Sequence, residues 1–242
     1  MKSIQGGQEP NLSCKVAVSV AMGMSVVKLG GSLFKEGRSI LRFLRDFAAE
    51  QGLSIVVVPG GGPFADFIRK ISSSAGISEE ASHWMSILAM HQYAFFLTDG
   101  VEVPLVERLE EISHTEKVTK KASEGICVVF LPFNLLREED ELRHSWDVSS
   151  DTIAAFVAKK LGERKIIKIT NVDGIYDDKG RIIHRIHARD MIKRKFLGCV
   201  DAELPRFLME NKIRCIIVNG KRRERLEKVL LGEHAECTEI LP

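Results

Sequence analysis

The chain has 242 residues, of which 45% are hydrophobic and 28% charged, and its formal net charge is +2. This composition is sufficient for a well-filled core and gives no basic field of the kind that nucleic-acid-binding proteins present. No apolar stretch reaches the roughly 18 residues of a membrane span, so we expect neither nucleic acid nor membrane as a partner.

The number and spacing of the cysteines indicate the cellular compartment of the protein. The cysteines are Cys14, Cys127, Cys199, Cys215 and Cys237, and no two of them have the spacing of a zinc or redox motif. An odd, scattered set favours reduced thiols over disulfides, so we expect a cytoplasmic protein without a cysteine-bound metal.

The N-terminus differs from the rest. Residues 1–23 begin polar and continue into a weakly apolar run, Val16–Met22, which lacks the strongly apolar centre of a secretory signal. Met22 or Met24 could equally be the natural start. We predict that residues 1–23 are an extension, disordered or produced by a wrongly assigned start, and that residues 24–242 form one domain.

Apolar periodicity predicts alternating strands and helices along this domain. Strands are expected at Met24–Leu29, Leu53–Val58, Ile126–Leu131, Lys165–Thr170, Ile182–Ile183, Ile213–Val218 and, as an edge strand, Cys237–Leu241. Helices are expected at Glu36–Gln51, Phe64–Ser73, Ser78–Leu97, Thr152–Leu161, Asp201–Lys212 and Lys221–Leu231. The alternation indicates an α/β fold, a three-layer sandwich with a mostly parallel central sheet. The segment Val101–Ile112 fits neither pattern.

The first strand carries a lysine, Lys28, and breaks at Gly30 and Gly31 before Ser32. Strand, glycine turn and helix start together form a site for anions, because free amides and the helix dipole face the same gap. A lysine in a buried strand is costly unless something negative meets it. This segment therefore predicts a phosphate site, with a structural ion pair of Lys28 as the alternative.

The strand–turn–helix unit occurs a second time, at Pro59–Pro63 with Gly60, Gly61 and Gly62. Two such turns at one edge of a parallel sheet could hold two anionic groups facing each other. The same turn also satisfies the dinucleotide fingerprint G-x-G-x-x-A. That alternative is weak, because Glu79 and Glu80, at the distance of the ribose-binding acid, open a helix instead of ending a strand.

A third polar segment precedes the helix at Thr152. It contains Asp147, Ser149, Ser150 and Asp151, whereas a helix N-cap needs only one such residue. Glycine turns, a strand lysine and surplus carboxylates, without a set of nucleophilic side chains, indicate phosphoryl transfer, which depends on positioning and charge neutralisation. The Walker A motif is absent.

These motifs, in this order, resemble those of the amino acid kinase superfamily, and the segment Thr170–Tyr176 (Thr-Asn-Val-Asp-Gly-Ile-Tyr) completes the set. Narrower stretches, among them Pro59–Ala65 and His144–Trp146, look like the archaeal kinases of methanofuran biosynthesis. That resemblance implies phosphorylation of a small phosphomonoester, an aminomethylfuran phosphate, to its diphosphate with ATP and Mg²⁺.

The resemblance also implies residue roles. Lys28 would neutralise the transferring phosphoryl group, and Asp151 would hold catalytic lysines in place. The residues implied at the nucleotide are Gly30, Gly31, Ser32, Thr170, Asp173, Gly174 and Tyr176. Those implied at the acceptor are Gly60, Gly61, Gly62 and Asp147. We also expect Arg69 at the acceptor, because a guanidinium suits a phosphate or carboxylate fork, with a surface arginine as the alternative.

One departure concerns a second lysine, which many relatives carry in a Gly-Met-x-x-Lys segment before the late helix. Here the corresponding Leu197–Asp201 has none. Either Lys193 or Lys195 reaches the site, or Asp201 has another task, such as binding Mg²⁺ or the ammonium of the substrate.

Two alternatives keep the fold. The acceptor could be isopentenyl phosphate, UMP or a carboxylate such as N-acetylglutamate, or the chain could be a nucleotide-binding module without catalysis. Lys28 and Asp151 together favour catalysis. The Met- and aromatic-rich helix at Ser78–Leu97 favours a homo-oligomer, with that helix at a dimer contact.

Overall fold

The computed structural model describes residues 24–112, 115, 125–195 and 198–242, so the predicted extension at residues 1–23 lies outside the described residues. An 8-stranded sheet runs through the molecule in the order β3-β4-β2-β1-β5-β7-β8-β6. Neighbouring strands are parallel except for the antiparallel pair β7–β8. The strands are β1 Ser25–Leu29, β2 Ser54–Pro59, β3 Leu105–Val106, β4 Ile126–Phe130, β5 Lys165–Thr170, β6 Arg185–His187, β7 Arg214–Asn219 and β8 Thr238–Leu241.

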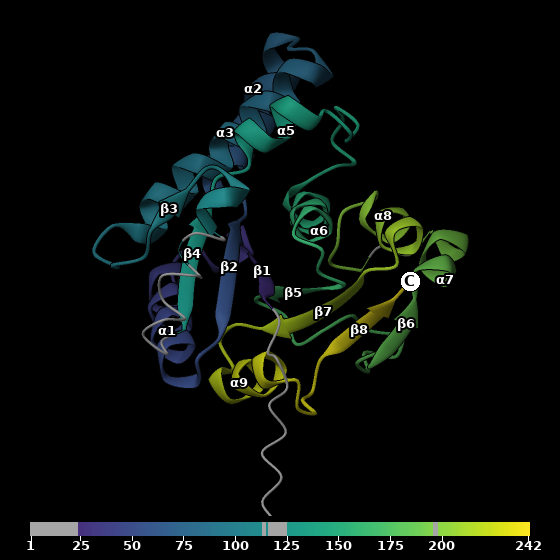
Figure 1. Cartoon of the computed structure of the whole chain (residues 1–242). Helices are drawn as coiled ribbons and strands as arrows, with labels where there is room; N and C mark the ends of the chain where they lie inside the picture. Colours follow the sequence, from purple (N-terminus) through teal and green to yellow (C-terminus); the bar gives the residue numbers. More distant parts are fainter. Residues whose placement is uncertain (1–23, 113–114, 116–124, 196–197) are drawn as a thin grey trace, which may run out of the picture.

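The helices divide between the two faces of this sheet and one of its ends (Figure 1). They are α1 Gly37–Gln51, α2 Gly62–Ala75, α3 Glu79–Thr98, α5 Phe133–Glu139, α6 Ser150–Lys160, α7 Ala188–Arg194, α8 Leu204–Asn211 and α9 Arg223–Leu231, with a short 3-10 turn η1 at Gly31–Leu33.

Side chains point alternately to the two faces of the sheet along each strand and form two separate apolar cores. Val27 of β1 packs in one core with Leu44 of α1 and Leu226 of α9. Val26 of β1 points the other way and packs with Phe156 of α6, in a core that also contains residues of α8. Successive strand residues face opposite sides of a sheet, so both faces are covered. The predicted three-layer α/β sandwich with a mostly parallel sheet is confirmed.

Helices α2, α3 and α5 gather at one end of the sheet, at the top of Figure 1, where side chains of α3 join both cores and side chains of α5 join the core that contains Phe156. The φ angle of Gly62 is +54°, which a glycine adopts at little cost, and Pro63 follows in the first turn of α2. Ser78 caps α3 by accepting a hydrogen bond from the Ala81 amide at 3.2 Å. These helices form one wall of the cavity described below.

Most predicted elements are present with shifted ends, and two predictions are wrong. Ile182 forms only an isolated bridge with Tyr176, and the short strand lies at β6 instead. Strand β8 is not an edge, because it pairs with both β7 and β6. The sequence pattern missed α5 and α7, which have 7 residues each and are too short to show helical periodicity. Within the described residues, no helix has the length and apolarity to cross a membrane.

Candidate active site

The two glycine turns touch. Leu29 at the end of β1 lies opposite Pro59 at the end of β2, so the turns that follow leave the sheet side by side. A Cβ atom on Gly31 would lie 2.5 Å from the Cα atom of Gly62. Any side chain at Gly31 would force the two backbones apart. The predicted meeting of the turns at one edge of the sheet is confirmed.

Not every glycine amide is available to a ligand. The Gly30 amide donates to the Ile169 carbonyl at 2.9 Å and the Gly60 amide to the Leu29 carbonyl at 2.8 Å, so both extend the ladder of the sheet. Amide contacts from Gly30 and Gly60 to phosphates, as the sequence predicts, are therefore not supported. Gly31 and Gly62 contribute no such ladder bond among the described residues and line the open cavity.

Beneath the first turn lies a buried charge cluster. Lys28 of β1 and Lys168 of β5 are register partners, and their side chains meet at the carboxylate of Asp151 in the first turn of α6. Lys28 Nζ lies 2.7 Å from Asp151 Oδ1, and Lys168 Nζ binds Asp151 Oδ2 and the Cys199 carbonyl oxygen. Lys28 is 7% exposed, Lys168 5% and Asp151 3%.

The cluster shifts the protonation equilibria of its members in different directions. Burial alone would raise the pKa of Asp151, but the two ammonium groups outweigh it and bring the pKa to about 2. The pKa of Lys28 is lowered, chiefly by burial and also by the charge of Lys168, although Asp151 opposes this. Burial acts in the same sense on Lys168, yet Asp151 raises its pKa overall. Two ammonium groups share one carboxylate, so an incoming anion would restore the balance at Lys28.

Lys28 lies within reach of the glycine turn. A Cβ atom on Gly30 would lie 3.8 Å from Lys28 Nζ. Neither Lys28 nor Asp151 lines the cavity, but Gly31, three residues after Lys28, and Ser150, next to Asp151, do. The structure thus places the predicted pair of Lys28 and Asp151 together, immediately below the surface on which phosphates would rest.

Sequence reasoning missed Lys168. Two signals were available: a lysine among isoleucines in a buried strand, and a strand that ends in the same loop motif, Thr170–Tyr176. The proposed substitutes for the second lysine are wrong, because Lys193 and Lys195 are exposed on and after α7 and no ion pair ties either to the cluster within the described residues. Leu197 lies outside the described residues.

Asp201 is also not a ligand-binding group. Its Oδ2 accepts from the Ser149 amide, the Ser149 hydroxyl and the Thr152 amide at 2.8–3.0 Å. Its Oδ1 accepts from the Thr152 hydroxyl at 2.6 Å and the Leu204 amide at 2.8 Å. A carboxylate has about four lone-pair sites, so these donors leave no room for Mg²⁺ or a substrate ammonium. Asp201 instead fixes the start of α6, and thereby Asp151, against the start of α8.

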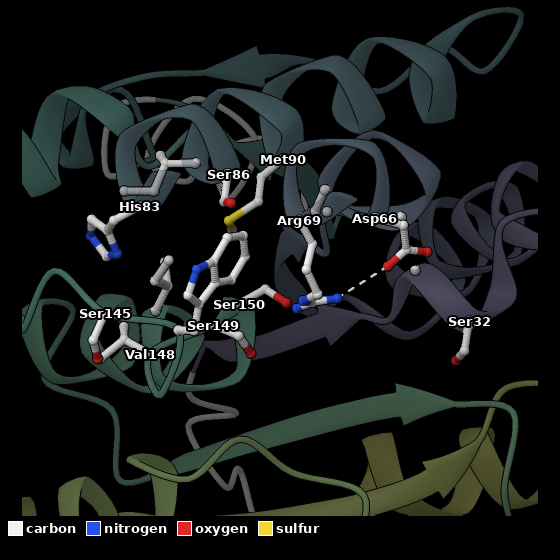
Figure 2. A pocket seen from close by; sticks show the side chains of 17 residues that line it. Ser32, Asp66, Arg69, His83, Ser86, Met90, Ser145, Val148, Ser149 and Ser150 are labelled. Carbon is white, nitrogen blue, oxygen red and sulfur yellow. Dashed lines mark hydrogen bonds and ion pairs between the residues drawn. The ribbon is translucent and has the colours of Figure 1, made fainter. Parts of the chain in front are cut away.

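Above the turns lies a cavity of about 370 Å³, lined by Gly31, Ser32, Gly61 and Gly62 at one end (Figure 2). Arg69 of α2 lines it as predicted, with its guanidinium 4.9 Å from the centroid of the Trp146 ring. Arg69 also pairs with Asp66 at 3.2 Å. The predicted Asp147 does not line the cavity: its side chain is exposed, while the neighbouring residues on both sides face inward.

On the other side of Ser32 lies the predicted nucleotide loop. The Ser32 and Thr170 hydroxyls lie 3.3 Å apart, which joins the first glycine turn to the end of β5. Asp173 accepts from Asn219 at 2.9 Å and pairs with Arg225 at 2.8 Å. Gly174 is buried, and Tyr176 is 40% exposed. The loop with Asp173, Gly174 and Tyr176 follows the carboxyl end of β5, and Asn219 is the last residue of β7. Ligands bind at such carboxyl ends in open parallel sheets.

Comparison with known proteins agrees with this geometry. A sequence model of the amino acid kinase family matches residues 23–219. The chain is 33% identical over 220 residues to the [5-(aminomethyl)furan-3-yl]methyl phosphate kinase of Methanocaldococcus jannaschii, covering 90% of this chain and 98% of that protein. It is 28% identical to a uridylate kinase of Thermofilum pendens, covering 90% of this chain and 97% of that protein.

The fold has solved counterparts. The uridylate kinase of Archaeoglobus fulgidus superposes with a TM-score of 0.66 at 22% identity, over 90% of this chain and all of that one. With the family model matching most of the chain, the protein belongs to the amino acid kinase family, and it is an enzyme of the kinase class. Lys28, Asp151 and the paired glycine turns lie within the matched region.

Proposed function

We propose that this kinase transfers the γ-phosphoryl group of ATP to the phosphate of a small phosphomonoester, [5-(aminomethyl)furan-3-yl]methyl phosphate, and forms its diphosphate in methanofuran biosynthesis. The observation that carries the proposal is the cavity itself. Its phosphate end has open glycine amides and Arg69. The rest combines apolar side chains, among them Met90, Val148 and Ile153, with polar ones such as His83 and Ser86, which suits a phosphate joined to a small flat ring with a polar substituent. The relative in M. jannaschii, matched over 98% of its length, supports the same acceptor.

The chemistry needs no general base. A phosphomonoester is largely dianionic at neutral pH, since its second pKa is about 6. One of its oxygens attacks the γ-phosphorus, a new P–O bond forms, and the bond from that phosphorus to the bridging oxygen breaks to release ADP. The barrier then depends on holding two anions together, so neutralisation of charge is the main task of the protein.

In this mechanism Gly31, Gly61 and Gly62 orient the facing phosphates, and Arg69 holds the acceptor phosphate. Lys28, beneath Gly30, is directed at the transferring group. Asp151 of the first turn of α6 holds Lys28 in place, and Lys168 of the neighbouring strand in turn binds the other oxygen of Asp151. Thr170, Asp173, Gly174 and Tyr176 line the nucleotide.

Mg²⁺ would supply further neutralisation of the nucleotide phosphates. Within the described residues, no group of three or more His, Cys, Asp or Glu side chains is arranged to hold a metal ion. Asp151 and Asp201 are engaged by lysines and by amide and hydroxyl donors. Mg²⁺ commonly keeps several waters and binds through substrate phosphates, so we assign it to ATP and not to a protein cage.

We also place the enzyme in the cytoplasm as a homo-oligomer. Phe67 of α2 is 61% exposed, as is Phe95 of α3, and Leu88 of α3 is 45% exposed. Exposed aromatic side chains on two helices that pack together suit an interface with a second copy. Light scattering of the purified protein should give a multiple of 27.1 kDa, and Phe95→Glu should reduce it. A wild-type protein that is monomeric at micromolar concentration would contradict this.

The test of function is ³¹P NMR of the purified protein with ATP, Mg²⁺ and the aminomethylfuran phosphate. Parallel samples contain isopentenyl phosphate, UMP and N-acetylglutamate, the last with hydroxylamine to trap an acyl phosphate. We expect coupled diphosphate signals with the furan compound alone. Diphosphate formed from another acceptor would refute the proposed substrate but support the proposed reaction class. ATP binding without turnover of any compound would favour a nucleotide-binding module without catalysis.

A further inference from the structure

One face of α3 lines the acceptor cavity from its middle to the end that is remote from the glycine turns. His83, Ser86, Ile87 and Met90 follow helical spacing and point to the same side. Figure 2 shows His83 and Ser145 at the end opposite Ser32 and Asp66, with Ser86 and Met90 along the wall between them. The cavity thus has a phosphate end and a distal end.

On this face of α3, two polar side chains make no hydrogen bond within the described residues, whereas the neighbouring Ser145 hydroxyl accepts one from the Asp147 amide at 3.3 Å. The Ser86 hydroxyl oxygen is buried and makes no hydrogen bond. The His83 ring makes no hydrogen bond within the described part of the chain, although the residue is only 6% exposed. Its orientation is set by packing, since it stacks on His144 with centroids 4.9 Å apart and meets the Trp84 ring edge-on at 5.3 Å. Buried polar groups in native proteins are normally satisfied, so a fixed, unsatisfied pair facing a cavity indicates a ligand.

The protonation state of His83 decides what this pair can bind. Burial, and next the nearby His144, lower the pKa of His83 to about 4, although Asp140 opposes this. At neutral pH the imidazole is therefore uncharged and keeps one nitrogen lone pair as an acceptor. The Ser86 oxygen offers further lone pairs.

The charged groups around the cavity differ between its two ends. Behind His83, His144 Nε2 lies 2.8 Å from Asp140 Oδ1, and His144 Nδ1 lies 4.0 Å from Glu80 Oε1. The distal end thus lies near two carboxylates, while the opposite end presents amides and Arg69, which is paired there with Asp66. A ligand that is anionic at one end and cationic at the other fits this arrangement.

We propose that His83 and Ser86 are the specificity residues for a primary ammonium group at the distal end of the acceptor, each accepting a hydrogen bond from it. The proposal rests on the proposed function and deepens it: the preferred acceptors are phosphomonoesters whose small apolar body carries an amine. Val148, Ile153 and Met90 line the space between the two ends and would contact that body.

The experiment compares two compounds, the aminomethylfuran phosphate and the analogue in which methyl replaces aminomethyl. Dissociation constants are measured by titration calorimetry and kcat/KM by ADP release. The variants are Ser86→Ala, His83→Phe, which keeps a ring but no acceptor, and His83→Gln, which restores an acceptor oxygen. Ser74→Ala, an exposed position on α2 outside the cavity, is the matched control.

We expect wild type to prefer the amine, and Ser86→Ala and His83→Phe to weaken its binding by about 10- to 100-fold each with little change for the methyl analogue. His83→Gln should recover part of the loss. Equal losses for both compounds, or no preference in wild type, would overturn the inference even if diphosphate is formed. Selective binding of the amine without turnover would leave the inference standing and refute the proposed function.

Discussion

Lys28 and Lys168 lie opposite each other in the parallel register of β1 and β5, and each binds a different oxygen of the Asp151 carboxylate. The sheet therefore carries two adjacent lysines on one face, held by the first turn of α6. We propose that Lys168 takes the place of the lysine that the late segment Leu197–Asp201 lacks, because it supplies a second positive charge from a neighbouring strand.

The most direct prediction concerns Lys28. Lys28→Ala should lower kcat by at least about 10²–10³-fold, the usual effect of removing one group that stabilises charge in the transition state. The KM values should change less, and circular dichroism should show an intact fold. Lys193→Ala, at an exposed position on α7, is the control and should keep wild-type kcat. Activity retained in Lys28→Ala, or lost in the control, would contradict the assignment.

The buried cluster also predicts a stability pattern. Asp151→Asn leaves two buried ammonium groups without a carboxylate between them, so we expect a loss of about 3–5 kcal/mol in the free energy of unfolding. Adding Lys168→Met removes one of these charges and should recover part of that loss. Urea denaturation of the two single variants and the double variant measures the coupling. Simple additivity of the two substitutions would show that Lys168 and Asp151 do not act as a unit.

Asp201 gives opposite predictions for a structural and a ligand-binding role. In Asp201→Asn an NH2 group replaces one of the two acceptor oxygens, so either the Thr152 amide or the Leu204 amide faces a donor, and stability should fall by about 2 kcal/mol. The ratio of kcat/KM for the aminomethylfuran phosphate to that for its methyl analogue should stay at the wild-type value. A selective loss for the amine would restore the hypothesis that Asp201 binds the ammonium.

The pKa of His83 predicts a pH dependence of stability. Because its pKa falls from an ordinary value of 6.5 to about 4 on folding, the unfolded chain binds this proton more readily. The stability that the folded protein gains from keeping His83 neutral is fully present above pH 6.5 and is lost as the pH falls toward 4. Water in the cavity screens part of the effect, so we expect a loss of about 1–2 kcal/mol.

Thermal unfolding across that pH range provides the measurement. His83→Gln should flatten the profile relative to wild type, while the exposed His187→Gln should leave it unchanged. Asp140, Glu80 and His144 lie around His83 and are present in both proteins, so the difference between the profiles isolates His83. Parallel profiles for wild type and His83→Gln would contradict a neutral, buried imidazole.

Local patterns in the sequence were enough to predict the strand–turn–helix units, the α/β fold class and the meeting of the two glycine turns. Each of these follows from apolar period, glycine position and the rule that parallel strands end at one edge of the sheet. Lys28 and Arg69 could also be identified. A lysine in a buried strand needs a negative partner, and a guanidinium about two helix turns beyond a glycine turn is well placed to bind a phosphate.

Only the tertiary structure decided which groups remain free to bind. The amides of Gly30 and Gly60 are used by the sheet, and the Asp201 carboxylate is filled by donors from α6 and α8. Strand register selected Lys168, and packing of α3 over the turns left Ser86 and His83 without partners. Residue type gives the capacity for hydrogen bonds and charge, whereas contacts between distant segments determine how much of that capacity is already satisfied.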